Sequence, residues 1–140
     1  MKRIMAGAFL VLASVPVTAF ACCVVDLSLP KAELDAVTDQ AQRGDRDAMY
    51  RLFQHYQLSK DAWSRAYWGE RLAELNDTRV LLNLADWYDK LGTPYHCRRA
   101  IELAQQRARL ASTQVERESA LTIARYFAGT HTSAHKCGRK

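Results

Sequence analysis

One pattern of side chains occurs three times in this chain: in MYRLFQHY at residues 49–56, in LLNLADWY at residues 81–88 and in ALTIARYF at residues 120–127. In each copy an aliphatic residue stands four positions before an aromatic one, so the two side chains lie on one face of a helix. The copies are offset by 32 and 39 residues, which is the length of a helical hairpin. The pattern therefore predicts a small stack of antiparallel helix pairs. The paired positions are Leu52 with Tyr56, Leu84 with Tyr88, and Ile123 with Phe127.

A different pattern occupies the stretches between these copies. Residues 62–75 carry a row of small side chains, and residues 97–110 match this row at an offset of 35. Small residues at such a spacing allow a neighbouring helix to approach closely. Two types of helix are therefore expected to alternate along the chain. The matched positions are Ala62 with Cys97, Ala66 with Ile101, Gly69 with Ala104, and Ala73 with Ala108.

Signals for helix starts and ends divide residues 31–129 into about six helices. Asp45 and Asp77 are expected to cap the second and fourth helices, and Thr93-Pro94 to open the fifth. Connections of two to four residues make sequential helices antiparallel. The sequence therefore predicts an all-α fold of antiparallel helical hairpin repeats, an α-solenoid, in one domain that follows an extended lead at residues 22–30. Other boundaries are expected at Pro30, Gly44, about Lys60, Gly92, Ser112 or Thr113, and Gly129.

Residues 1–21 have the features of a bacterial signal peptide. The segment starts with basic residues, continues with an apolar run over residues 4–20, and ends with a small-x-small cleavage site, AFA, at residues 19–21. A membrane span is the alternative, but the run is short and contains Pro16. Without this segment the formal charge falls from +5 to +3, which is too small an excess to indicate nucleic-acid binding. We expect a periplasmic protein with no nucleic acid as partner.

Cleavage after residue 21 would make Cys22 the first residue, which is the position that lipoprotein processing requires. Ala21 suits a lipobox, whereas Ala19 replaces the usual Leu and Phe20 is bulky. Two alternatives follow. The protein is either attached to the membrane through a lipid on Cys22 or is soluble in the periplasm.

Export also bears on the four cysteines, Cys22, Cys23, Cys97 and Cys137. In an oxidising compartment cysteines are more often bridged than free. Four cysteines allow three pairings. We favour a disulfide between Cys97 and Cys137, because it would tie the tail that follows Phe127 to the start of a helix. A pairing of Cys22 or Cys23 with either of them is the rival.

Metal binding and catalysis find little support in the residues. His131 and His135, with His96-Cys97 and Cys137, form a hypothetical metal site if the two histidines share a helix face. Nothing predicts a helix in the basic tail, residues 130–140, so we expect no metal there. The chain contains no glycine-rich phosphate loop, no Ser-His-Asp order and no His-Glu-x-x-His string. We therefore expect no catalytic residues, no cofactor and no enzymatic activity.

Residues 41–77 resemble the Sel-like subfamily of tetratricopeptide repeats. The matching string is A-x-x-G-D-x-x-A-x-x-x-L-x-x-x-Y over residues 41–56, followed by KD at residues 60–61 and A-x-W at residues 66–68. A second copy begins at Asn76 and departs from the pattern there and at Val80, where the first copy has Gly and Ala. The resemblance implies a scaffold that holds other proteins. Sel-like proteins of bacterial envelopes resemble adaptors for cell-wall or signalling machinery, and some small exported ones are immunity partners of antibacterial effectors.

Two columns of side chains lie beside the core stripe on the helices that contain the three repeated stretches. In a stack of hairpins these columns would face the concave side, where polar and aromatic groups form a recognition surface. In the alternative interpretation, Trp87 and Tyr126 complete the edge of the core and Arg51 is merely solvated. The candidate residues of a partner-binding groove are Arg51, His55, Asn83, Trp87, Thr122 and Tyr126.

Two functional hypotheses follow, and in both of them the partner is another protein. The first is an exported, non-enzymatic adaptor that presents its concave face to a component of the bacterial envelope. The second is an immunity or inhibitor protein that occludes one antibacterial effector or envelope enzyme.

Overall fold

The structure, a computed structural model, describes residues 28–129 and Cys137. This part of the chain contains no strand, so the all-α prediction is confirmed. The predicted signal peptide, the lipidation candidate Cys22 and the basic tail apart from Cys137 lie outside the described residues. None of the helices in residues 28–129 combines the length and the apolar character needed to cross a membrane. The helices are α1 (Lys31–Gln42), α2 (Arg46–Ser59), α3 (Ala62–Glu74), α4 (Thr78–Leu91), α5 (Pro94–Arg109) and α6 (Gln114–Phe127).

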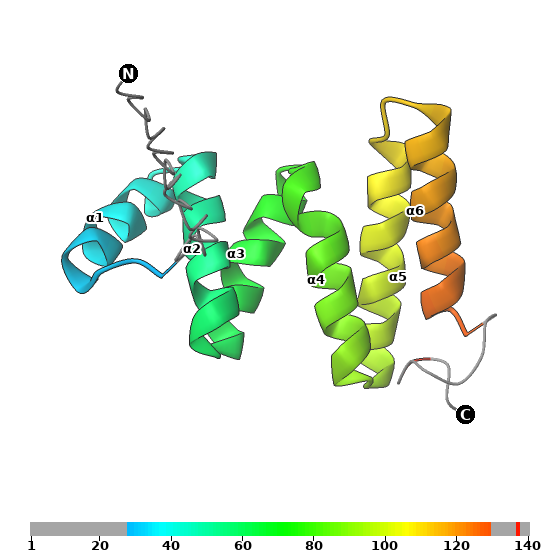
Figure 1. Cartoon of the computed structure of the whole chain (residues 1–140), viewed down its shortest axis with the longest axis horizontal. Helices are drawn as coiled ribbons and strands as arrows, with labels where there is room; N and C mark the ends of the chain where they lie inside the picture. Colours follow the sequence, from blue (N-terminus) through cyan, green and yellow to red (C-terminus); the bar gives the residue numbers. More distant parts are fainter. Residues whose placement is uncertain (1–27, 130–136, 138–140) are drawn as a thin grey trace, which may run out of the picture.

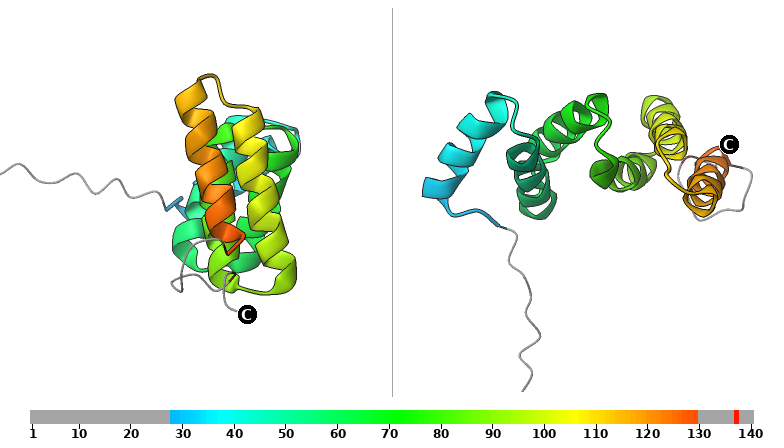
Figure 2. Two further views of the ribbon diagram at one scale, coloured as in Figure 1. Left: turned by 90° about the vertical axis from the view of Figure 1, so that its right-hand side faces the viewer. Right: turned by 90° about the horizontal axis from the view of Figure 1, so that it is seen from above.

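The six helices stand side by side in chain order, with α1 at one end of an open row and α6 at the other (Figure 1). Connections of two to four residues join them, and consecutive helices from α2 onward run in opposite directions. Seen from above, α2, α4 and α6 lie on one side of the row, whereas α3 and α5 lie on the other (Figure 2). The two types of helix that alternate in the sequence therefore form two layers.

Side-chain caps set the helix starts largely as predicted. The carboxylate of Asp45 accepts hydrogen bonds from the backbone N–H groups of Asp47 and Ala48, at 2.9 and 3.0 Å. Asp77 caps α4, and Thr93 caps α5, where Pro94 is the first helical residue. These caps satisfy amide groups that would otherwise lack partners at each helix start. The structure also fixes two boundaries that the sequence left open. Asp61 caps α3, which begins at Ala62. Thr113 and not Ser112 caps α6.

The hydrophobic core runs along the whole row and contains the repeated pairs. Leu52 and Leu84 are completely buried, Tyr88 and Phe127 are nearly so, and Tyr56 and Ile123 pack against the core from its edge. Each helix contributes its apolar stripe, so that one continuous core joins α1 to α6. The core contains Val37 and Ala41 of α1, Met49 and Phe53 of α2, Leu72 and Ala73 of α3, Val80 and Leu81 of α4, Leu103 and Ala104 of α5, and Ala124 of α6.

Arg79 links the start of α4 to α2. Its guanidinium donates to the carboxylate of Asp47 at 2.8 Å and to that of its own cap, Asp77, at 2.6 Å. The same guanidinium lies over the ring of Tyr50, with 4.5 Å between its carbon and the ring centroid. The hydrogen bond from Arg79 lowers the pKa of Asp77 below its usual value. This buried carboxylate therefore stays charged and holds the start of the second hairpin against the first.

Gly69 of α3 lies in close contact with both neighbouring helices. A Cβ atom at this position would lie 3.0 Å from Cδ1 of Leu84 on α4 and 3.0 Å from Cε2 of Phe53 on α2. Such distances are shorter than ordinary van der Waals contacts, so a side chain here would force its neighbours apart. The small-residue row predicted from the sequence thus lets α3 sit between α2 and α4.

We predict that Gly69→Val lowers the free energy of unfolding by about 1–3 kcal/mol, because the added methyl groups overpack the contact with Phe53 and Leu84. Urea unfolding followed by circular dichroism measures this change. Ser119→Val is the matched control: it places the same side chain at an exposed position of α6 and should cost less than about 0.7 kcal/mol. A Gly69→Val variant as stable as the control would contradict the close packing.

Cys97 and Cys137 form a disulfide with a Cα–Cα distance of 5.3 Å, as the sequence analysis favoured. The Sγ atom of Cys137 also lies 3.7 Å from the backbone carbonyl oxygen of Asp89 on α4. The bridge therefore places Cys137 against the start of α5 and the end of α4. Because both sulfur atoms are in the bridge, neither is a thiolate available to a metal.

We predict that Cys137→Ser lowers the free energy of unfolding by up to about 4 kcal/mol, because the bridge closes a loop with a sequence separation of 40 and restricts the unfolded chain. Thermal unfolding of the variant and of the reduced wild type should agree. Peptide mapping without reductant should recover the peptides of Cys97 and Cys137 joined. Recovery of Cys97 joined to Cys22 or Cys23 would refute the pairing.

Candidate binding site

Two of the six candidate groove residues, both on α2, bind α1 and the segment that precedes it. Arg51 forms an ion pair with Glu33 of α1, and Nδ1 of His55 accepts a hydrogen bond from the backbone N–H of Leu29 at 2.9 Å. The second bond requires the imidazole proton to be on Nε2 when the ring is neutral. Both side chains are thus engaged in contacts within the chain.

The remaining candidates differ in exposure. Asn83 and Thr122 are exposed, and the hydroxyl of Thr122 donates to the carbonyl oxygen of Glu118, one turn earlier, at 2.8 Å. Tyr126 and Trp87 are half-buried and pack against the core. The guanidinium carbon of Arg65 lies 4.9 Å from the ring centroid of Trp87. Of the six candidates, Trp87 is the one that lines the hollows described next; whether the others contact a partner stays a prediction.

An apolar hollow of about 440 Å³ lies between α3 and the corner where α4 meets α5. Its rim is formed by Trp63, whose exposed fraction is 88%, and by Tyr95, whose exposed fraction is 62%. Inside it the rings of Tyr88 and His96 stack, with 5.2 Å between their centroids. We call this site the aromatic hollow. It is lined by Ala62, Trp63, Ala66, Trp87, Tyr88, Leu91, Tyr95 and His96.

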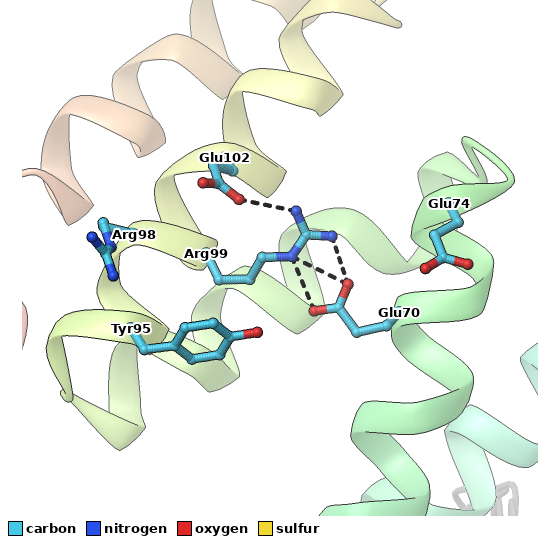
Figure 3. A pocket seen from close by; sticks show the side chains of 6 residues that line it. All are labelled: Glu70, Glu74, Tyr95, Arg98, Arg99 and Glu102. Atoms are coloured by element: carbon cyan, nitrogen blue, oxygen red, sulfur yellow. Dashed lines mark hydrogen bonds and ion pairs between the residues drawn. The ribbon is translucent and has the colours of Figure 1, made fainter.

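A charged hollow of about 510 Å³ continues the same surface further along α3 and α5, and the two hollows share Tyr95. Figure 3 shows Glu70 and Glu74 on α3 across from Arg99 on α5. Arg99 donates from Nε to Oε1 of Glu70 at 3.0 Å and from Nη1 to Glu102 at 3.1 Å. The site is lined by Glu70, Glu74, Tyr95, Arg98, Arg99 and Glu102.

Glu70 also joins this surface to the core. The phenol of Tyr88 donates to Oε1 of Glu70 at 2.7 Å, and burial together with this bond raises the pKa of Tyr88 above its usual range. The hydrogen bond to Glu70 likewise raises the pKa of Arg99. Further along, the amide of Gln106 donates to the carbonyl oxygen of Ala73 at 2.6 Å. These contacts fix α5 beside α3, so the walls of both hollows are held in place.

The two hollows lie on a face that was not predicted from the sequence. The predicted groove lies on α2, α4 and α6, whereas the charged hollow lies between α3 and α5 and the aromatic hollow between α3 and the corner of α4 and α5. Trp63 and Tyr67 are one helical turn apart on α3, and both are exposed. This spacing is visible in the sequence. An aromatic pair beside a row of small residues would have been the signal that pointed to this face.

Comparisons of the chain with protein-family models, with curated proteins and with solved structures found no match. The resemblance of residues 41–77 to Sel-like repeats therefore stays a prediction. Among residues 28–129 and Cys137, histidine, cysteine and acidic side chains do not gather in a group of three or more that could hold a metal ion.

We predict that two tryptophan substitutions in the aromatic hollow differ in their effect on stability. Trp87→Ala should lower the free energy of unfolding by about 2–3 kcal/mol, because Trp87 packs against the core and against Arg65. Trp63→Ala should change it by less than about 0.5 kcal/mol, because this ring is exposed. Urea unfolding tests both variants. Equal stability of the Trp87→Ala variant and the wild type would show that Trp87 is not a packing residue.

Proposed function

We propose that this chain is a non-enzymatic protein-binding module that serves as an exported adaptor of the bacterial envelope. The observation that carries the proposal is the aromatic hollow, whose rim holds Trp63 at 88% exposure and Tyr95 at 62%. Large aromatic side chains that face solvent together are typical of protein-interaction sites, and tryptophan and tyrosine are frequent among the residues that contribute most to binding. A partner side chain that enters this hollow would cover both rings.

The rigidity of the walls supports the same proposal. A binding surface loses less conformational entropy when its side chains are already held by packing. Trp87 lies on the Arg65 guanidinium, and Glu70 accepts hydrogen bonds from both Tyr88 and Arg99. The base of the aromatic hollow is therefore organised before a partner arrives, while Trp63 at the rim stays free to adapt.

Export is part of the proposal and has separate support. The features of residues 1–21 are typical of a signal peptide, and the disulfide between Cys97 and Cys137 is of a kind that persists in oxidising compartments. A periplasmic location agrees with both, with or without a lipid on Cys22. The similarity of residues 41–77 to Sel-like repeats agrees with a role in holding other proteins.

An immunity or inhibitor protein is the second candidate function. It is favoured by the small size of the domain and by an aromatic hollow confined to one corner of the row, which suits a single tightly bound partner. The two functions differ in the partners that the hollow should capture: several assembly components for an adaptor, and one effector or hydrolase for an inhibitor.

Capture of partners from envelope extracts, with the mature chain as bait, tests the proposed function. We expect Trp63→Ala to weaken the captured interaction by about 30-fold or more, since the loss of an aromatic residue that is a binding hot spot costs about 2 kcal/mol or more. Val115→Ala is the control, because Val115 is also exposed but lies on α6. Capture that survives Trp63→Ala and Tyr95→Ala together would contradict the proposal, and so would hydrolysis of a cell-wall or lipid substrate by the purified protein.

A further inference from the structure

A third hollow, of about 280 Å³, lies where the end of α2 and the start of α3 meet α4. It shares Ala62 and Trp87 with the aromatic hollow, but its other residues are polar or basic. We call it the basic hollow. Its remaining lining residues are Tyr56, Gln57, Lys60 and Arg65.

Arg65 is held in this hollow between two aromatic rings. Its guanidinium carbon lies 4.9 Å from the ring centroid of Trp87 and 5.7 Å from that of Phe53. Contacts with ring faces attract the positive charge but do not satisfy the N–H groups at the edge of the guanidinium. The Nε atom of Arg65 is buried and has no hydrogen-bond partner within the described part of the chain. Burial also lowers the pKa of this guanidinium, although an arginine remains charged at neutral pH.

The nearby carboxylates do not bond to Arg65. Asp86 accepts a hydrogen bond from Nζ of Lys90 at 2.7 Å and attracts Arg65 only at longer range. Asp61 accepts hydrogen bonds from the backbone N–H and the hydroxyl of Ser64, at 3.0 and 2.8 Å. Both carboxylates are thus committed to other groups. A charged group whose donors lack an acceptor costs free energy when it is partly buried. Arg65 as a whole is partly exposed and lines the hollow, so an anion there can pair with the outer N–H groups of the guanidinium rather than with the buried Nε.

Lys60 adds a second positive charge to the same hollow. It ends α2 in the left-handed region, with φ at 64°, which is uncommon for a residue other than glycine. Many helices end in this way, and the conformation places Lys60 at the turn between α2 and α3. The amide of Gln57 and the phenol of Tyr56 supply neutral hydrogen-bond donors beside the two cations.

We propose that the basic hollow binds a compact oxyanion, a carboxylate or a phosphate group, with Arg65 as its principal donor and Lys60 as the second cation. Its volume exceeds that of several water molecules at about 30 Å³ each, so such a group fits with room for the atoms that carry it. The site does not depend on the proposed function, because its two cations, Arg65 and Lys60, line the basic hollow and not the aromatic hollow.

Titration of the isotopically labelled mature chain with sodium phosphate and with sodium acetate, at constant ionic strength, tests the site by nuclear magnetic resonance. We expect the Nε–H resonance of Arg65 and the indole N–H resonance of Trp87 to shift and to saturate. Saturation by phosphate alone identifies phosphate as the bound group, and saturation by acetate at similar concentration identifies carboxylate. Shifts that rise linearly with either salt, or that equal those caused by sodium chloride, would overturn the proposal.

Variants assign the binding to the hollow. Arg65→Gln should weaken anion binding at least about tenfold, since a hydrogen bond to a charged group contributes about 1.5–3 kcal/mol. Lys60→Gln should weaken it by a smaller factor and leaves the packed guanidinium in place. Arg43→Gln, at an exposed position between α1 and α2, should bind as the wild type does. Unchanged binding by both Arg65→Gln and Lys60→Gln would refute the site. If Arg65→Gln does not fold, unchanged binding by Lys60→Gln, together with wild-type resonances of Arg65 and Trp87 that do not saturate, would refute it.

Discussion

The close contact of α3 with α2 and α4 sets the positions of the other helices in the row. At Gly69 the backbone of α3 approaches Phe53 and Leu84 so closely that a Cβ atom would meet both at 3.0 Å. This contact brings α3 into the row as the first member of the layer that also contains α5 (Figure 2). The position of α3 then determines where Trp63 and Ala66 stand relative to the corner of α4 and α5. The aromatic hollow lies between these elements, so its shape depends on the position of α3.

Polar contacts hold α5 beside α3. They involve charged groups whose burial would cost free energy if they were not paired. Glu70 accepts from Arg99 and from Tyr88, and the side chains of Glu70 and Arg99 are each about one-quarter exposed. A largely buried ion pair of this kind adds less to stability than its short distances suggest, because both charges lose hydration. Its main effect is on the relative position of the helices that it joins. Glu70 of α3 is bonded at once to Tyr88 of α4 and to Arg99 of α5. These bonds fix the position of α5 relative to α3 and therefore the shape of the surface between them.

The sequence predicted the fold well because its signals are local. Caps such as Asp45, Asp77 and Thr93 act within one helical turn, and the Leu–aromatic pairs mark a buried stripe, so the six helices could be placed from the chain alone. The sequence favoured the pairing of Cys97 with Cys137 without excluding Cys22 or Cys23, and this pairing is present in the structure.

The hollows were not predicted because they depend on contacts between residues that are distant in the chain. Arg99 meets Glu70 across 29 positions, and periodicity within a helix says nothing about such a pair. The contacts of Arg51 with Glu33 on α1 and of His55 with Leu29, just before α1, could not be predicted for the same reason.

We propose that a partner protein contacts the face of α3 and α5 at the aromatic hollow. A map of amide and indole chemical-shift changes for the labelled chain bound to its captured partner would locate this contact. We expect the largest changes on the indole of Trp63 and on residues 62–74 and 91–102, which include the two walls. Changes concentrated on α1 or α6, with the Trp63 indole unaffected, would contradict it.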